Sequence, residues 1–501
     1  MGKAGALGAS ILTGRAISGT IGDNDNKAGE PAGRGDAMTE QTEMERFLKK
    51  MKGRRADVIG IGVSNKPLIE LLARAGARTT ACDKKTAEQL GEETCRWLKD
   101  LGVQTKLGPD YMEELEGEVI FRSPGVRPDQ PGLEAARVRG SRVTSEMEVF
   151  FAVCPCPILA VTGSDGKTTT TTLIAEMLKK EGRKVWIGGN IGQPLLAQAG
   201  EMTPEDLCVV ELSSFQLMTM RRSPHVAVVT NVTPNHLDVH KSMEEYVEAK
   251  ENIWLHQGAE DLLVVNADNP LSAAMAERAS GEVLRFSCRS RPENGAFYQD
   301  GALYLSQNGR AEKVMEAGEI RIPGMHNVEN YMAALCAVSR YVQPETVRQV
   351  AMEFAGVEHR IELARRLDGV DYYNDAIATS PARAIAGFRA FDQKLIVIAG
   401  GYDKKIPFEE YGREACRHVK LLILNGATAA KLRQAVESAP EYPGCGIEIE
   451  ERDTLEQAVA LAHERAQPGD IVTLSPACAS FDAYPNFMVK GRAYKELVQK
   501  L

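Results

Sequence analysis

Short apolar runs alternate with amphipathic segments along most of the chain. Each run ends in a glycine or a polar residue, a pattern typical of strands buried on both faces of a parallel sheet. The segments between the runs repeat apolar residues with the spacing of one helix face. This alternation predicts an α/β fold with doubly wound parallel sheets. The expected strands include one that begins at Asp57 and those at residues 78–82, 119–121, 158–160, 184–187, 207–212, 226–232, 262–265, 371–373, 394–398, 421–424 and 471–474.

The length of 501 residues suggests three α/β domains. We expect a Rossmann-like N-terminal domain over residues 53–146, a central parallel-sheet domain of the P-loop type over 147–356, and a Rossmann-like C-terminal domain over 357–501. Residues 1–37 are rich in small and polar residues and are expected to form a disordered extension. Methionines stand just after this extension, so a start codon placed too far upstream and a functional tail both remain open.

Composition narrows the functional classes. The formal net charge of -9 argues against nonspecific nucleic-acid binding. No apolar run reaches the roughly 18 residues that a membrane span needs. The ten cysteines are scattered singly through apolar segments, which fits reduced thiols, and Cys154-Pro155-Cys156 is too sparse a pair for a zinc site. We therefore expect a cytoplasmic protein without nucleic-acid or membrane partners.

The segment Thr162-Gly163-Ser164-Asp165-Gly166-Lys167-Thr168 joins an apolar strand to a helical pattern over residues 169–180. A strand, a glycine turn and a helix start present backbone N–H groups and the positive end of the helix dipole to an anion. Lys167 adds a positive charge, and the Thr168 hydroxyl is placed to bind magnesium. Val161 takes the position of the first glycine in G-x-x-x-x-G-K-[ST], which disfavours an ordinary P-loop NTPase. The shorter motif still predicts a site for nucleotide phosphates.

Polar residues follow the next expected strands, at the edge where open α/β sheets bind ligands. They are Asn190, Glu211, Asn231 and His236. Glu211 has the position of a magnesium-binding carboxylate or of an acid at a helix N-terminus. His236 is either a metal or phosphate ligand or a loop histidine capped by Asp238. This edge therefore offers a candidate metal site beside the phosphate site.

A weaker glycine pattern opens the first domain. The first strand turns through Gly60 and Gly62 into a helix over residues 67–75, and the second strand ends near Asp83. An acid at this spacing could accept hydrogen bonds from a ribose or a base. A partial glycine motif of this kind also occurs where the glycines only let a helix pack closely against a strand, so both interpretations remain open. The turn Ser123-Pro124-Gly125 places further N–H groups at a strand end.

Polar turns also close the strands of the last domain. They are Asn374-Asp375, residues 400–404, Asn425-Gly426 and residues 475–480. Such an array at one sheet edge predicts a second substrate-binding rim.

Several segments, taken in order, resemble the Mur ligases of peptidoglycan synthesis. They are residues 162–168, 189–192, 211–216, 231–238, 324–327 and 359–360, and residues 123–125, 213–217 and 474–482 resemble the branch that adds D-glutamate. The resemblance covers nearly all of residues 53–501. It implies a monomeric enzyme in which ATP phosphorylates the carboxylate of UDP-N-acetylmuramoyl-L-alanine and the amine of D-glutamate attacks the acyl phosphate.

The resemblance also implies roles for residues at matching positions. Those for ATP are Gly163, Ser164, Asp165, Gly166, Lys167, Thr168 and Thr169, with Asn330 at the adenine, Arg360 at the phosphates and Asp375 at the ribose. Those for the UDP substrate are Gly62, Ser64, Asn65, Asp83, Ser123, Pro124, Gly125, Asn190 and Ser213. Those for D-glutamate are Thr379, Lys404, Ser480 and Phe487. The implied ligands of two magnesium ions are Thr168, Glu211, His236 and Lys250, and the implied catalytic set is Lys167, Glu211, His236 and Lys250.

Lys250 matches the position where the family carries a lysine carbamylated by carbon dioxide. The modified side chain would be an anion that positions magnesium, whereas without the resemblance a solvated helix lysine is the simpler interpretation. Ile377 stands where better-known members of the family carry a lysine. The contact of that lysine with nucleotide or product is therefore not expected in this chain. The three domains imply closure on substrate binding, with hinges near residues 145–157 and 356–359.

Three alternatives remain open. A sibling ligase would add another amino acid, although the diamino-acid type is disfavoured because no clear D-N-P-[RN] signature appears in the C-terminal segment. A folylpolyglutamate synthetase would share the phosphate motif but not the glycine-rich unit before residue 146. A non-catalytic sensor of UDP-sugars or nucleotides would need neither Lys250 nor His236.

Overall fold

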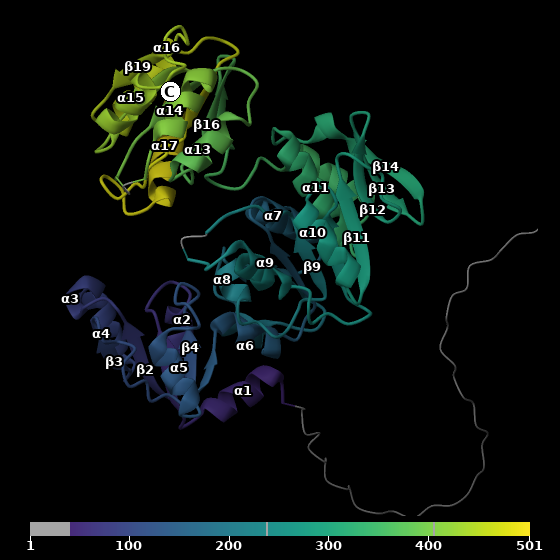
Figure 1. Cartoon of the computed structure of the whole chain (residues 1–501), viewed down its shortest axis with the longest axis vertical. Coiled ribbons are helices and arrows are strands. Elements are labelled where there is room, and N and C mark those ends of the chain that lie inside the picture. Colours follow the sequence, from purple (N-terminus) through teal and green to yellow (C-terminus); the bar gives the residue numbers. More distant parts are fainter. Residues whose placement is uncertain (1–40, 237–238, 404–405) are drawn as a thin grey trace, which may run out of the picture. The chain divides into compact units, whose positions relative to one another are not determined.

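The computed structural model describes residues 41–236, 239–403 and 406–501 (Figure 1). The extension expected over residues 1–37 lies outside the described part of the chain. Three separate β-sheets follow one another along the sequence. Their central strands are buried and most are separated by helices, so the predicted α/β fold class is confirmed.

The first sheet has the strand order β3-β2-β1-β4-β5 and is parallel throughout. This order reverses direction between β1 and β4, where open α/β sheets form a ligand crevice at the carboxyl ends of their strands. The strands are β1 (Arg55–Ile59), β2 (Arg78–Asp83), β3 (Gln104–Leu107), β4 (Val119–Arg122) and β5 (Arg142–Thr144). The helices are α1 (Glu43–Met51), α2 (Lys66–Arg74), α3 (Ala87–Leu90), α4 (Glu92–Asp100), α5 (Pro131–Val138) and α6 (Glu146–Val153).

The second sheet has the order β14-β13-β12-β11-β10-β9-β6-β8-β7. Its strands are β6 (Ile158–Thr162), β7 (Val185–Gly189), β8 (Leu207–Glu211), β9 (Val226–Val229), β10 (Leu262–Asn266), β11 (Glu282–Ser287), β12 (Gly295–Gln299), β13 (Ala302–Gln307) and β14 (Arg310–Glu316). Its helices are α7 (Lys167–Lys180), α8 (Ser214–Leu217), α9 (Met243–Glu251), α10 (Pro270–Met275), α11 (Met325–Val338) and α12 (Pro344–Glu353), with 3₁₀ turns η1 (Leu196–Glu201), η2 (Ala276–Arg278) and η3 (Ala317–Glu319). Apolar residues of α7, α11 and α12 pack on one face, and those of α6, η1 and α9 pack on the other.

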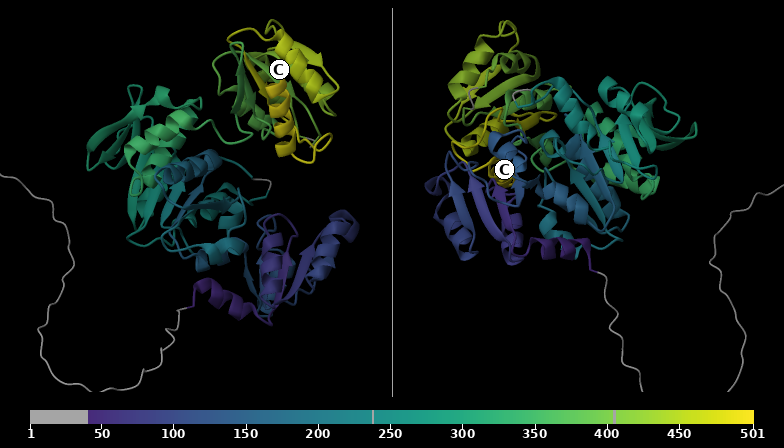
Figure 2. Two further views of the ribbon diagram at one scale, coloured as in Figure 1. Left: turned by 180° about the vertical axis from the view of Figure 1, so that it is seen from behind. Right: turned by 60° about the horizontal axis from the view of Figure 1, so that its bottom comes forward.

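An antiparallel extension of this sheet was not expected from the sequence. Strands β12, β13 and β14 pair antiparallel and form its outer edge, which Figure 2 shows in green from behind. Asp300-Gly301 and Asn308-Gly309 connect them, with positive φ at all four residues. Two-residue turns of this composition and conformation are the preferred hairpin connections.

The third sheet has the order β15-β16-β20-β17-β18-β19 and is parallel except for the antiparallel strand β15. Its strands are β15 (Glu362–Leu367), β16 (Val370–Asn374), β17 (Leu395–Ala399), β18 (Val419–Leu424), β19 (Glu448–Glu451) and β20 (Ile471–Leu474). Its helices are α13 (Pro381–Phe388), α14 (Glu409–His418), α15 (Ala429–Glu437), α16 (Leu455–Arg465) and α17 (Phe487–Lys500). Within the described residues, no helix combines the length and the apolarity that crossing a membrane requires.

Candidate active site

The predicted phosphate site is a loop between β6 and α7 that only glycine can form. Gly163 has φ of 153°, and a Cβ atom there would lie 1.9 Å from Thr230 Oγ1. Gly166 has φ of 78°, and its Cβ would lie 2.4 Å from Asn330 Oδ1. Because α7 begins at the next residue, the N–H groups of its first turn have no acceptor within the helix and point toward the loop.

The end of β9 holds this loop in place. Asn231 accepts hydrogen bonds from two loop N–H groups, with its carbonyl from Ser164 and its Oδ1 from Asp165, both at 2.9 Å. Thr230 Oγ1 donates to the Asp165 carbonyl at 2.6 Å. The Ser164 hydroxyl also donates to the Thr233 carbonyl and lies 2.9 Å from the Tyr246 hydroxyl. These bonds use the N–H groups of residues 164–165, so a phosphate would depend on those at the start of α7.

Two lysines share one carbonyl of the loop. Lys167 Nζ donates to the Gly163 carbonyl at 2.9 Å and to the Ser164 carbonyl at 2.8 Å. Lys250 Nζ donates to the same Gly163 carbonyl at 2.7 Å, and its side chain is 1% exposed. Burial lowers the pKa of both lysines, and the positive charge of Lys167 lowers the pKa of Lys250 further. Lys250 is therefore a buried amine biased toward its neutral form and not a solvated helix lysine.

Glu211 ends β8 beside the phosphate loop, because β8 pairs with β6 in a register that places it opposite Val161. Its Oε1 accepts a hydrogen bond from Asn190 Nδ2 at 2.7 Å. Its Oε2 is buried and has no hydrogen-bond partner among the described residues. A buried carboxylate oxygen without a donor is costly unless a cation binds it. Carboxylate oxygen is a preferred ligand of Mg²⁺, so Glu211 fits the magnesium role better than a helix-capping role.

His236 lies on an exposed turn next to an aromatic cluster. Its backbone has φ of 55°, and its ring is 5.2 Å from the Phe215 ring in an edge arrangement. Phe215 stacks on the buried His240, whose Nε2 is 2.9 Å from Ser214 Oγ. Asp238, the alternative capping partner of His236, lies outside the described residues.

The other residues expected at ATP occupy buried or half-buried positions. Asn330 Oδ1 accepts from Thr170 Oγ1 at 3.2 Å, behind the phosphate loop, while Thr168 and Thr169 lie in the first turn of α7. Arg360 Nε is buried and has no hydrogen-bond partner among the described residues. Asp375 Oδ2 accepts from Ser475 Oγ at 3.1 Å, and burial raises the pKa of Asp375 to about 7.

The residues expected at UDP gather at the crevice of the first sheet. Asp83 binds its own loop, with Oδ2 accepting from the Ile61 N–H at 2.7 Å. Asn65 Nδ2 donates to the carbonyls of residues 59 and 60 at 3.0 Å. A Cβ at Gly60 would lie 3.0 Å from Ser123 Cβ, so β1 and β4 approach closely at this crevice. Gly62, Ser64 and Gly125 are exposed on these loops, and Ser123 and Pro124 are half-buried.

Two more residues of the UDP set belong to the second sheet. Asn190 donates to Glu211 through both its backbone and its side chain. Ser213 caps α8, with its Oγ donating to Gln216 Oε1 at 2.9 Å. Their position near Glu211 follows from the adjacent strands β7 and β8.

The D-glutamate candidates belong to the third sheet and its loops. Ser480 is buried after β20, Thr379 is half-buried before α13, and Phe487 begins α17. Lys404 lies outside the described residues. The sequence did not single out Lys490, which is buried and donates to the Gly400 carbonyl at 2.8 Å. Lys490 lies in α17, and nothing in the sequence of this helix distinguishes it from a lysine exposed to solvent.

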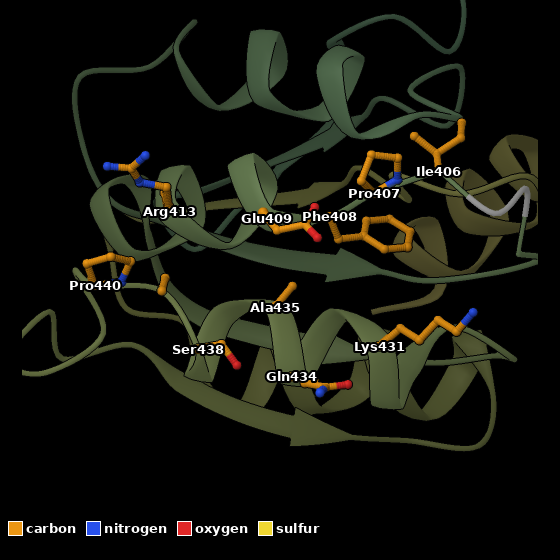
Figure 3. A pocket seen from close by; sticks show the side chains of 11 residues that line it. Ile406, Pro407, Phe408, Glu409, Arg413, Lys431, Gln434, Ala435, Ser438 and Pro440 are labelled. Atoms are coloured by element: carbon orange, nitrogen blue, oxygen red, sulfur yellow. The ribbon is translucent and has the colours of Figure 1, made fainter.

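A cavity of about 510 Å³ lies elsewhere, between α14 and α15 (Figure 3). Its lining includes Phe408, Arg413 and Lys431, and none of the candidate site residues contributes to it. It sits between two helices and not at the carboxyl edge of a sheet, so it is not the candidate active site.

Residues 161–338 match the middle domain of Mur ligases, and residues 359–478 match the Mur ligase glutamate ligase domain. The chain belongs to the Mur ligase family, and the resemblance seen in its motifs is confirmed. It is 50% identical to the UDP-N-acetylmuramoylalanine--D-glutamate ligase of Clostridium acetobutylicum, over 91% of this chain and 98% of that protein. It is also 50% identical to the protein of that name from Acetivibrio thermocellus, over 92% of this chain and 99% of that protein.

Solved structures agree on the fold. The UDP-N-acetylmuramate-alanine ligase of Thermotoga maritima aligns with a TM-score of 0.55 at 18% identity, covering 89% of this chain and 99% of that one. A pseudomurein peptide ligase of Methanothermus fervidus aligns with a TM-score of 0.50 at 18% identity, covering 89% of this chain and all of that one. At this identity the likeness concerns architecture alone.

Proposed function

We propose that the chain is an ATP-dependent ligase that joins UDP-N-acetylmuramoyl-L-alanine to D-glutamate in peptidoglycan precursor synthesis. The observation that carries the proposal is the 50% identity to ligases of that name over nearly the whole chain. The phosphate loop with its two lysines and the buried Glu211 oxygen that has no donor among the described residues support it, because a phosphoryl-transfer site must stabilise several negative charges.

The reaction has two steps. A carboxylate oxygen of the alanyl group attacks the γ-phosphorus of ATP, which forms an acyl phosphate and releases ADP. The amine nitrogen of D-glutamate then attacks the acyl carbon, phosphate leaves with the bonding electrons, and the nitrogen loses a proton. Lys167 and the N–H groups of α7 bind and orient the phosphates, because they supply positive charge at fixed positions.

Magnesium fits the donor set on the Glu211 side of the loop. Glu211 Oε2 would hold it, with the Thr168 hydroxyl and His236 as the further ligands proposed for two sites. When bound, Mg²⁺ neutralises charge on the transferred phosphoryl group. Asn190 fixes the Glu211 carboxylate through its 2.7 Å hydrogen bond, so that the free oxygen faces one direction.

Lys250 is proposed to carry a carbamate. The neutral amine attacks carbon dioxide, a C–N bond forms, and one proton passes to solvent, which converts a buried neutral amine into an anion. Burial and the charge of Lys167 support this step, because both lower the pKa of the Lys250 amine. Protein prepared with ¹³C-bicarbonate should show a carbamate carbon signal that is lost in Lys250→Arg. A wild-type protein active in carbonate-free buffer and without this signal would contradict the modification.

The substrates are proposed to divide among the three sheets. The uridine nucleotide would bind the crevice around Asp83 and Ser123, and ATP the loop at Gly163. D-glutamate would bind near Thr379 and Ser480 on the third sheet. We also propose that the domain boundaries are 53–146, 147–356 and 357–501, and that the enzyme acts as a cytoplasmic monomer.

Phosphate release from ATP tests the proposed function directly. The assay combines ATP, Mg²⁺ and UDP-N-acetylmuramoyl-L-alanine with D-glutamate, and compares L-glutamate, L-alanine and diaminopimelate as acceptors. Release that needs D-glutamate supports the proposal. Release with another acceptor would assign a sibling ligase instead, and no release with any acceptor would favour a non-catalytic sensor.

A further inference from the structure

Three cysteine thiols meet at the opposite end of the second sheet from the phosphate loop. Cys154 ends α6, Cys156 precedes β6, and Cys208 is the second residue of β8. Their sulfur atoms are 3.6 Å apart for Cys154 and Cys156, 3.7 Å for Cys154 and Cys208, and 3.4 Å for Cys156 and Cys208. The Sδ atom of Met202 lies 3.7 Å from the Cys208 sulfur. Four sulfur-bearing side chains therefore occupy one small volume.

The fold fixes this arrangement. The Cys208 N–H donates to the Pro157 carbonyl at 3.0 Å, and Cys208 pairs with Ile158 across the β6 and β8 ladder. The N–H of Cys154 donates to the Phe150 carbonyl at 2.9 Å and so holds the end of α6. The cysteine positions follow from strand pairing and a helix cap, not from a flexible loop.

The sulfur separations match those of thiolates that share one metal ion. With Zn–S bonds of about 2.3 Å in tetrahedral geometry, two thiolates lie ~3.8 Å apart. The three separations fall within a few tenths of an ångström of that value. We propose that Cys154, Cys156 and Cys208 form a binding site for a divalent thiophilic metal ion, of which Zn²⁺ is the representative.

Burial and charge favour a divalent ion. Cys156 is 2% exposed and Cys208 is fully buried, while Cys154 is half-buried and gives solvent access to the site. Binding of Zn²⁺ to three thiols forms three Zn–S bonds and releases three protons, which leaves one net negative charge. Three thiolates around Cu⁺ would leave two, which costs more in a buried place. The fourth position faces either solvent or the Met202 thioether.

This site is distinct from the proposed magnesium site. The thiols lie at the start of β6 and β8, whereas the phosphate loop and Glu211 follow the ends of these strands. A strand of this length separates its two ends by roughly 15 Å. The metal would tie the segment between α6 and β6 to the second sheet, so it would stabilise the fold and would not take part in the ligase reaction. From the sequence alone, Cys154 and Cys156 offered too few ligands for a zinc site. The third ligand, Cys208, is remote along the chain and joins them only in the folded structure.

Cobalt substitution tests this site. The tag-free, phosphine-reduced full chain is stripped with chelator and titrated with Co²⁺ in the presence of excess Mg²⁺. We expect near-ultraviolet thiolate-to-cobalt charge-transfer absorption that saturates at one Co²⁺ per chain and disappears when Zn²⁺ is added. The excess Mg²⁺ keeps Co²⁺ from the magnesium site, whose oxygen and nitrogen ligands would give no such band.

Variants separate this cluster from the other thiols. Cys208→Ser and the half-buried Cys154→Ser should each weaken Co²⁺ binding at least ~10-fold, because each removes a ligand. Cys95→Ser, which removes a thiol on α4, should leave the titration unchanged. Zn²⁺ should also raise the melting temperature of wild type but not of Cys154→Ser.

Three results would overturn the proposal. They are the absence of the charge-transfer band, a band that survives in both cluster variants, and a fully reduced chain that takes up neither Co²⁺ nor Zn²⁺. None of them bears on phosphate release, so failure here leaves the proposed ligase function standing.

Discussion

At the residue scale, the most specific requirement in the second sheet is that of Glu211 Oε2 for a cation, because this buried oxygen has no hydrogen-bond partner among the described residues. The side chain of Glu211 is 1% exposed, and within the described part of the chain only one of its carboxylate oxygens has a hydrogen-bond donor. Glu211→Gln keeps the shape but removes the charge that is proposed to hold Mg²⁺. We expect kcat to fall at least ~100-fold, because one electrostatic contact to the transferring group is lost.

The stability of this variant distinguishes function from folding. Glu211→Gln should unfold at the same temperature as wild type or higher, because it removes a buried charge whose Oε2 has no hydrogen-bond donor among the described residues. The matched control is Glu248→Gln on the exposed side of α9, which should change neither value. Wild-type magnesium dependence in Glu211→Gln would contradict the assigned role.

The sequence could identify candidate residues but not their environments. Glu211 and Lys250 were placed by motif, yet the buried free oxygen and the shared Gly163 carbonyl depend on strand pairing and on α9. Thr230 was missed because a threonine at a strand end has no signature. Its importance follows only from the 1.9 Å approach that a Cβ at Gly163 would make.

At the scale of elements, the glycine turn that starts α7 can be tested against a matched glycine at its end. Gly166→Ala places a Cβ 2.4 Å from Asn330 Oδ1, whereas Gly182 has a similar positive φ and nothing within 4 Å of its Cβ position. Both alanine variants should lose ~1 kcal/mol of stability from the left-handed backbone. Only Gly166→Ala should raise KM for ATP, by at least ~10-fold, in steady-state kinetics. Equal KM values for the two variants would contradict the role of this loop.

A buried acid on α6 should make stability depend on pH. Glu146 Oε1 accepts from the Leu196 N–H at 2.8 Å, and burial raises the pKa of Glu146 from 4.5 to about 7. Between these values the folded chain binds more protons than the unfolded chain, so the free energy of unfolding falls as pH rises from 4.5 to 7 and levels above 7.

Glu146→Gln keeps an acceptor for Leu196 and should reduce this slope, with a gain of order 1–3 kcal/mol at pH 8. Asp375, whose pKa is also raised to about 7, should keep part of the slope. The exposed Glu93→Gln should behave as wild type in denaturant titrations at pH 5 and pH 8. An unchanged slope in Glu146→Gln would refute this origin of the pH dependence.

Elements with a continuous apolar run could be predicted from the sequence, whereas elements with a weaker apolar pattern could not. The buried runs at β6, β8, β9, β10, β17 and β20 were all expected, because a continuous apolar run bounded by turn residues has few other solutions. The hairpins of β12 to β14 were overlooked although Asp300-Gly301 and Asn308-Gly309 signal them. Their strands are partly exposed at the sheet edge, which weakens the apolar pattern.

At the scale of the whole molecule, the substrates are proposed to bind residues of three different sheets, so we expect these sheets to come together during the reaction. The segment before the third sheet has positive φ at Gly356, His359 and Ile361, conformations that are rare for the latter two and that mark strained backbone. This supports a hinge near residues 356–359. We expect small-angle scattering to show a smaller radius of gyration when an ATP analogue and UDP-N-acetylmuramoyl-L-alanine are both present. Identical profiles with and without these ligands would count against closure.

The division of the chain into α/β units followed from its hydrophobic pattern, but the joining of distant segments did not. Cys208 meets Cys154 and Cys156 only through the pairing of β6 with β8. Asn330 likewise reaches Gly166 only because α11 packs on α7. Such contacts depend on sheet order, which a single sequence does not specify.

The measurement that most directly tests the central claim is phosphate release from ATP with UDP-N-acetylmuramoyl-L-alanine, with and without D-glutamate, in wild type and Glu211→Gln. We expect sustained release only when both substrates and Mg²⁺ are present, and a loss of at least ~100-fold in the variant. Release that does not require D-glutamate, or that persists unchanged in Glu211→Gln, would contradict it.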